Sequence, residues 1–289
     1  MHKRDDAAAV RMRQREEPVA VDRTLPSRPT STATGKTPET TGGFWLTQAL
    51  IAGTAACAAT ALSHAVGRPV AAAASAGVLA VALTAQFRSD RYRVWVYWAT
   101  VAATGVTGAL AGLAGRDASG NVVVWIGVAV AVVSAAAVAS RLLGTVTPPF
   151  TPPTGRAERG LETLYWAAVL ATCAAGAAAV RLTAGSLPMG HALSQALFAV
   201  LVVGCSAAQW LAGTKAVACV WAAWLTVRSL GVSFAQWLAT PLAHGGLGWG
   251  QGPVTVLLGV IAAGQLGRFA EREQTGGLPS EAPDQDGDR

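Results

Sequence analysis

Arg228 is the residue whose position most directly suggests chemistry. It lies seven residues after Trp221 within a long apolar stretch, roughly 10 Å along a helix from that Trp. An Arg at such a depth in a bilayer costs at least ~2.5 kcal/mol and needs a partner, and the apolar runs supply no acid. Arg228 either extends toward lipid phosphates or helix-end carbonyls, or attracts an anion inside the protein.

Arg181 is a second candidate, and three histidines form a weaker one. Arg181 falls near the opposite end of its apolar run, from which a long side chain reaches the interface easily. His64, His191 and His244 are expected at one face of the membrane. Histidine binds metals and titrates near neutral pH, but no spacing pairs these three, so we predict no metal site.

No constellation typical of an enzyme occurs in the sequence. Ser63 and His64 lack a neighbouring acid, and no pair of carboxylates lies within an apolar run. The cysteines show no CxxC spacing, which predicts neither a disulfide framework nor a cofactor site; they are Cys57, Cys173, Cys205 and Cys219. The sequence therefore favours a protein that is not an enzyme and has no cofactor.

The elements that must position Arg228 are long apolar helices. The chain has 289 residues, of which 52% are hydrophobic and only 13% charged. About 20 apolar residues span a bilayer, and only helices or closed barrels satisfy the backbone there. The predicted fold is an all-α polytopic membrane bundle with about eight spans, near residues 44–65, 69–87, 94–114, 121–141, 162–184, 188–211, 214–238 and 251–268.

Pairs of residues ending in Trp recur along the chain and indicate internal repeats. The four tryptophans are Trp45, Trp98, Trp166 and Trp221, and the residues ten positions later are Ala55, Gly108, Gly176 and Gly231. Small residues at mid-bilayer depth let helix backbones approach closely. We predict four parallel two-helix repeats, at about 41–90, 91–145, 160–213 and 214–270.

Polar segments flank this predicted membrane domain, residues 41–270. Residues 1–40 are rich in Arg, Pro, Ser and Thr and predict a disordered tail without a signal peptide. Residues 145–155 form a Pro-rich linker, and residues 271–289 predict an acidic disordered tail. No basic helix or aromatic platform lies outside the membrane, so the net charge of +6 does not indicate nucleic-acid binding.

Lys and Arg are concentrated in alternate loops, which predicts orientation. One set of loops holds most of them, whereas the other set holds only Arg68 and Arg116. By the positive-inside rule, both termini are expected to be cytoplasmic. The Gly-rich segment 245–252 then lies outside and predicts a flexible or partly re-entrant loop, with Trp249 as an interface anchor.

Several segments resemble a family of bacterial integral membrane proteins with a tandem two-span repeat of unknown function. They are KTPETTGGFW (36–45), RYRVWVYW (91–98), LYWAAVLAT (164–172), VRSLGVSFAQW (227–237) and GGLGWGQGP (245–253). The resemblance covers about residues 36–270. It implies eight spans in four repeats and a bacterial cytoplasmic (inner) membrane, and it carries no established chemistry.

The chain departs from this family at polar positions. The resemblance implies an acid about fifteen residues after each Trp, where this chain has Thr60, Leu113, Arg181 and Gln236. A Lys and a Glu of the first repeat are replaced by Gln48 and Ala56, whereas Arg228 is kept. Intramembrane acids mark cation pathways, so this divergent member is not expected to carry cations.

Two functions remain open from the sequence. One is a transporter-like protein for a small anionic or neutral solute, with Arg228, Arg181 and Gln236 as candidate binding residues. The other is a non-transporting membrane scaffold or regulator, which the Ala-rich spans and the long tail would suit. The lipid bilayer and possibly a small solute are the expected partners.

Overall fold

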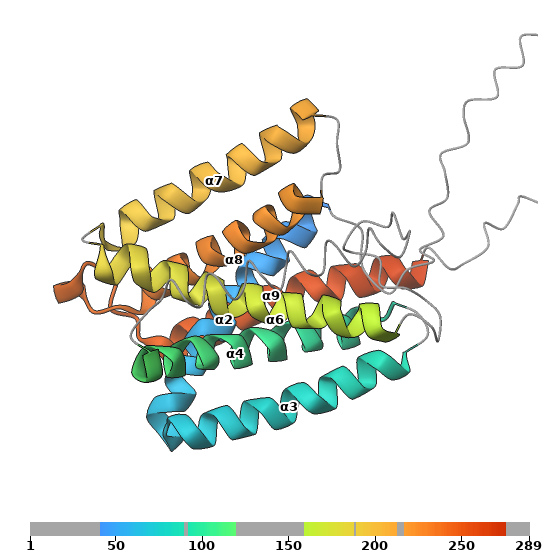
Figure 1. Ribbon diagram of the computed structural model, residues 1–289, viewed down its shortest axis with the longest axis horizontal. Helices are drawn as coiled ribbons and strands as arrows, with labels where there is room; N and C mark the ends of the chain where they lie inside the picture. The colour runs from blue at the N-terminus through green and yellow to red at the C-terminus, as the bar shows by residue number, and fades with distance from the viewer. Residues whose placement is uncertain (1–40, 90–91, 120–158, 188, 213–216, 276–289) are drawn as a thin grey trace, which may run out of the picture. The chain divides into compact units, whose positions relative to one another are not determined.

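Seven α-helices and no strand make up the residues that the computed structural model describes, which are 41–89, 92–119, 159–187, 189–212 and 217–275. They all belong to one compact unit, Ala33–Arg289. The helices are α2 (Gly42–Val66), α3 (Arg68–Arg88), α4 (Val94–Ser119), α6 (Arg159–Arg181), α7 (Gly190–Ala212), α8 (Val217–Ala239) and α9 (Gln251–Thr275) (Figure 1). A π-turn η2 (Leu182–Ser186) and a 3-10 turn η3 (Leu242–His244) follow α6 and α8.

Six of the described helices are long and apolar enough to cross a bilayer. They are α2, α3, α7, and the parts of α4, α6–η2 and α9 at Val94–Leu113, Glu162–Gly185 and Gln251–Arg272. The prediction of an all-helical membrane protein is confirmed at this level. The predicted tail 1–40, span 121–141 and linker 145–155 lie outside the described residues. The predicted span 214–238 coincides with α8, which forms a helix but is not among the six.

Local sequence signals explain where α2 begins and ends. The Thr41 side chain accepts a hydrogen bond from the Phe44 backbone N–H at 3.3 Å and caps the first turn. Gly67 ends α2 with φ 82°, a conformation that costs little without a Cβ. Pro69 then occupies the first turn of α3, where its missing N–H removes no helical bond. The chain therefore reverses between two long helices almost without a loop.

Many hydroxyl side chains within the helices donate to their own backbone, although the buried Ser233 hydroxyl of α8 has no hydrogen-bond partner among the described residues. Thr47 donates to the Gly43 carbonyl at 2.8 Å, Thr104 to Thr100 at 2.6 Å, and Ser229 to Leu225 at 2.9 Å. This i−4 bonding lets a polar residue sit in an apolar helix without a partner elsewhere. Thr and Ser therefore fill small spaces here and are not by themselves signs of a binding site.

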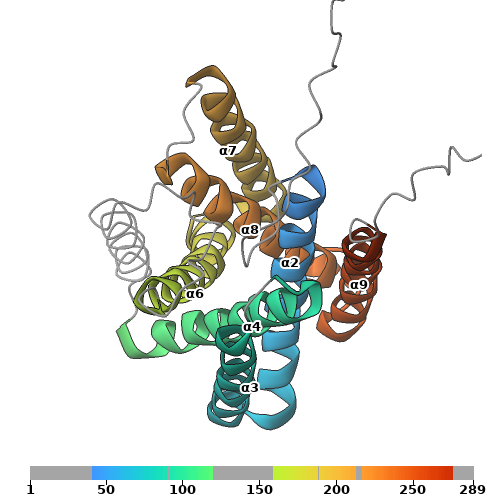
Figure 2. The same ribbon diagram turned by 90° about the vertical axis from the view of Figure 1, so that its right-hand side faces the viewer.

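Four helices form an inner ring. α2 contacts α4, α4 contacts α6, α6 contacts α8, and α8 contacts α2. The other helices lie outside this ring, where α3 packs mainly on α4, α7 on α8 and α9 on α2 (Figure 2). The aromatic residues near the beginnings of the four inner helices meet one another, so these helices run in the same direction.

Small residues lie where neighbouring inner helices touch. A methyl group on Gly108 of α4 would lie 2.6 Å from the Cys173 Cβ of α6, and one on Gly176 would lie 3.4 Å from the Ser229 hydroxyl of α8. At Gly231 of α8 a methyl group would collide with the Ala49 carbonyl of α2. The small positions that follow the Trp pairs are thus sites of helix contact, as close backbone approach requires.

The C-terminal part differs from the prediction in two places. Helix α9 continues to Thr275, into the predicted tail 271–289, with Glu271 and Arg272 exposed; charged residues that face water continue a helix readily. The glycine-rich segment folds back on the end of α8, since Leu247 donates to the Trp237 carbonyl at 2.9 Å and Trp249 to Leu238 at 3.0 Å.

Replacing Gly231 by Ala should destabilise the inner ring. The added methyl group meets the Ala49 backbone, and overpacking of this kind costs about 1–3 kcal/mol. Gly264 on α9 is the matched control, because nothing lies within 4 Å of its would-be Cβ and Ala favours helix by about 1 kcal/mol. Thermal unfolding in detergent should give a lower Tm for Gly231→Ala and an unchanged or higher Tm for Gly264→Ala. Equal Tm values for the two variants would contradict this account of the ring.

Candidate functional site

Aromatic side chains join the four inner helices at the end where those helices begin. Phe44 contacts Trp98 with ring centroids 5.4 Å apart, Tyr97 contacts Trp166 at 5.7 Å, and Tyr165 contacts Trp221 at 6.1 Å. Trp224 closes the circle by contacting Phe44 at 5.7 Å and Trp221 at 6.0 Å. We call this circle of aromatic side chains from the four inner helices the aromatic ring. Since each of its pairs contributes about 0.5–1.5 kcal/mol, it holds the beginnings of the four helices together.

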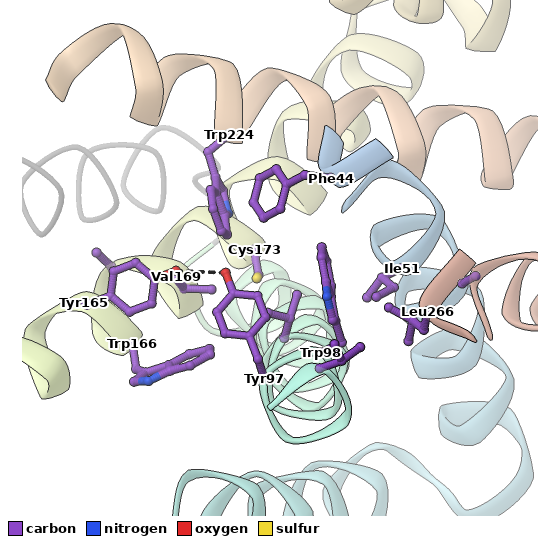
Figure 3. Close-up of a cluster of buried hydrophobic side chains, with 14 of the residues drawn as sticks. Phe44, Ile51, Tyr97, Trp98, Tyr165, Trp166, Val169, Cys173, Trp224 and Leu266 are labelled. Carbon is purple, nitrogen blue, oxygen red and sulfur yellow. Dashed lines mark hydrogen bonds between the residues drawn. The ribbon is translucent and has the colours of Figure 1, made fainter. Parts of the chain in front are cut away.

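The aromatic ring also holds a buried polar pair. The Tyr97 and Tyr165 hydroxyls lie 3.0 Å apart and form a hydrogen bond between α4 and α6 (Figure 3). Tyr97, Trp98 and Trp224 are each exposed to 1% or less. Figure 3 shows the Cys173 sulfur beside the Tyr97 hydroxyl. The hydroxyl pair and this sulfur thus lie among the aromatic side chains of the inner helices.

Arg228 of α8 lies inside the inner ring and is only 2% exposed. Its Nη1 donates a hydrogen bond of 2.9 Å to Oε1 of Gln48 on α2, which is 1% exposed. Arg228 also borders α6, since a methyl group on Gly176 would lie 3.8 Å from the Arg228 Cβ. The reading in which Arg228 extends to lipid phosphates is therefore wrong, because its guanidinium is enclosed by protein.

Small residues at equivalent positions make room for this guanidinium. Gly105 of α4 and Cys173 of α6 each lie seven residues after their own Trp, as Arg228 does. A methyl group on Gly105 would lie 3.1 Å from Nη2 of Arg228 and 2.9 Å from the Ala55 Cβ. Arg228 can therefore cross the ring interior only because its counterparts on α4 and α6 are small.

The site is rich in hydrogen-bond donors and poor in acceptors. Among the described residues no carboxylate pairs with Arg228, and its side-chain oxygen partner there is Gln48. The Nε2 amide of Gln48 is buried and makes no hydrogen bond within the described part of the chain. Gln48 cannot be turned to satisfy that amide, since its oxygen must face the guanidinium. The positive charge of Arg228 and the Gln48 Nε2 donor, which makes no hydrogen bond among the described residues, therefore lie together inside the protein.

The other predicted site residues lie elsewhere. Arg181 reaches α4 at Gly112, where a methyl group would lie 2.6 Å from its Nη2. Gln236 accepts a hydrogen bond of 3.2 Å from Gln251, about 12 Å along α8 from Arg228. The structure therefore brings Gln48, and not Gln236, to Arg228.

The three histidines predicted at the outer face do not form one site. His191 of α7 contacts the Thr240 hydroxyl at 3.4 Å, whereas His64 and His244 are exposed. Within the described residues, no three His, Cys, Asp or Glu side chains are grouped as metal ligands would be.

Gln48 is a candidate site residue that the sequence indicates only as a replacement for a Lys implied by the family resemblance. A stronger signal is its position, since Gln48 is a large amide three residues after Trp45. Three residues after Trp98, Trp166 and Trp221 the chain has Val101, Val169 and Trp224. A buried amide in an apolar layer implies a polar partner.

No protein-family model, curated protein or solved structure matches this chain. The family resemblance drawn from the Trp segments therefore stays a prediction, and the geometry of the site carries the functional argument alone.

The Tyr97–Tyr165 bond should appear as a coupling energy. Removing one hydroxyl leaves the other buried without its partner. The change in unfolding free energy of the double variant should therefore differ from the sum of the changes for Tyr97→Phe and Tyr165→Phe by about 0.5–1.5 kcal/mol. A second cycle of Tyr97→Phe with Trp249→Phe serves as the control, since Trp249 is 50% exposed in the far loop. Unfolding free energies in detergent would measure both cycles. Additive effects in the Tyr pair would remove this bond from the site.

Proposed function

We propose that this chain is an integral membrane protein that binds a small anionic or neutral solute inside its inner ring and moves it across the bilayer. The observation that carries the proposal is the enclosed Arg228, which is 2% exposed and has no carboxylate partner among the described residues. We propose no enzymatic activity and no cofactor.

The electrostatics of the site favour a bound solute. An unpaired charge buried in protein is costly, and groups that carry one normally meet a counter-charge or a metal. The single neutral amide of Gln48 offers only a dipole to Arg228. A solute with an acceptor atom would satisfy both the guanidinium and the Gln48 Nε2 amide, which lacks a partner in the described region.

The proposal includes eight spans in four parallel repeats. Two features support it. The second helix of a predicted repeat packs on the first helix of the following one, as α3 does on α4 and α7 on α8, and α9 returns to α2. The aromatic contacts follow the same order, since Phe44, Tyr97 and Tyr165 each contact the Trp of the next pair. A cyclic order of this kind is what duplication of one two-helix unit would produce.

The proposed location is a bacterial cytoplasmic membrane with both termini inside. The distribution of Lys and Arg among the loops supports this orientation. It would place the aromatic ring at the cytoplasmic end of the bundle and Arg228 beyond it. A solute entering from the cytoplasm would then pass the aromatic ring before it meets the guanidinium.

The closed packing around Arg228 supports a second candidate, a scaffold that transports nothing. Gly105, Gly108 and Gly231 all lie at contacts too close for a methyl group, so the ring is sealed in this state. The Arg228–Gln48 bond would then serve as a cross-link between α8 and α2. A scaffold requires a partner, and a pull-down with residues 1–40 that captures no cytoplasmic protein would count against it.

Purified protein in liposomes should move anions, and Arg228→Ala should abolish the flux. The reason is that this change removes the one buried positive charge that the described residues place inside the ring. Arg268→Ala on α9 is the control, because Arg268 is exposed and lies outside the ring. Flux would be followed with an anion-sensitive dye trapped in the vesicles. Unchanged flux in Arg228→Ala, with loss in Arg268→Ala, would exclude Arg228 from the mechanism.

A further inference from the structure

Resting on the proposed function, we infer that the solute is a singly charged inorganic anion, held jointly by the Arg228 guanidinium and the Gln48 Nε2 amide. Both side chains are at least 98% buried, at 2% and 1% exposure. They are already joined by the 2.9 Å bond through the Gln48 oxygen. The Gln48 Nε2 nitrogen is then held next to the guanidinium, and its protons make no hydrogen bond within the described residues.

The chemistry of the available groups selects an anion. A guanidinium has five N–H donors and no acceptor, and a side-chain amide has two more donors on its nitrogen. The acceptor that contacts Arg228, Gln48 Oε1, is already occupied by its Nη1. The remaining donors of Arg228 and Gln48 call for a ligand with acceptor atoms, whereas an amine cation would meet the positive charge of Arg228.

The charge of the site selects a single negative charge. Two charged side chains are buried among the described residues, Arg228 at 2% and Glu162 at 3% exposure. Glu162 lies near the start of α6, about 16 Å along that helix from Cys173, so Arg228 is the charge beside Gln48. A neutral ligand would leave the guanidinium charge uncompensated, and a doubly charged ion such as sulfate would leave one negative charge buried. Either imbalance is costly in a low-dielectric interior. One monovalent anion brings the net charge of the enclosure to zero.

The walls of the site favour a compact ion. The would-be Cβ of Gly105 lies 3.1 Å from the guanidinium and 2.9 Å from Ala55, so the space between α2 and α4 is filled. The Tyr97–Tyr165 bond of 3.0 Å joins α4 to α6 nearer the start of these helices. An organic carboxylate with an extended carbon skeleton would have to push these close helix contacts further apart than a halide or nitrate would.

In the variant Gln48→Glu the carboxylate of the new side chain takes the place of the bound anion beside Arg228. Glu has nearly the shape of Gln and places a carboxylate against Arg228, where an ion pair with fixed geometry would neutralise the charge. The bundle should therefore remain folded, unlike a variant that removes the guanidinium. Gln236→Glu is the matched control, because it makes the same chemical change about 12 Å away along α8, where Gln236 meets Gln251.

The test uses the full chain purified in detergent, with its Tm measured as sodium chloride replaces sodium gluconate at constant ionic strength. A ligand that binds only the folded state raises the Tm in a saturable way. Chloride, bromide and nitrate should raise it, whereas sodium sulfate at matched ionic strength should not. Gln48→Glu should have a higher Tm than the wild type in gluconate and should no longer respond to chloride. Gln236→Glu should respond as the wild type does.

Binding affinity gives a second readout. Arg228→Lys keeps the positive charge but loses the guanidinium fork, and should weaken chloride binding on the order of tenfold to hundredfold. A wild-type Tm that is the same in chloride and gluconate would overturn the inference, as would an equal response to sulfate. A full chloride response in Gln48→Glu would overturn it as well.

These results are independent of flux, so the inference and the proposed transport fail separately. Saturable chloride binding that Gln48→Glu abolishes, without flux in liposomes, keeps the anion site and removes transport. Flux of solutes regardless of charge and size, without a chloride effect on Tm, keeps transport and overturns the anion site.

Discussion

Four inner helices approach so closely that a single methyl group decides whether they fit. In a bilayer the surrounding lipid is as apolar as the helix surfaces, so burial of apolar area does not drive helices together and close van der Waals contact must do so. Gly108, Gly176 and Gly231 provide that contact along successive pairs of helices. The outer helices then pack on this ring, and their remaining apolar faces suit lipid.

The same closeness creates the polar site. With Gly105 and Cys173 at the positions equivalent to Arg228, the guanidinium crosses an interior that larger side chains would fill. Arg228 is thereby removed from water and lipid phosphates and left with the neutral amide of Gln48. The packing and the polar site are therefore linked, because the small residues that hold the helices together also leave the charge of Arg228 enclosed.

The aromatic ring separates this site from one end of the bundle. Its contacts join all four inner helices, and the Tyr97–Tyr165 bond fixes the two that face Arg228 from α4 and α6. A transport cycle must part this ring, whereas a scaffold keeps it closed. The two proposed functions differ in whether these aromatic contacts can exchange for contacts with a solute.

The sequence by itself determined the helical membrane class, because long apolar runs have one stable form in a bilayer. It also located Arg228, since an Arg in an apolar run is conspicuous. Only the tertiary structure decided what Arg228 meets. The partner is Gln48, 180 residues away in the chain, and Gln236, on the same helix, points to Gln251. Periodicity reports which face of a helix is apolar, but which helices become neighbours depends on how their surfaces fit together in three dimensions.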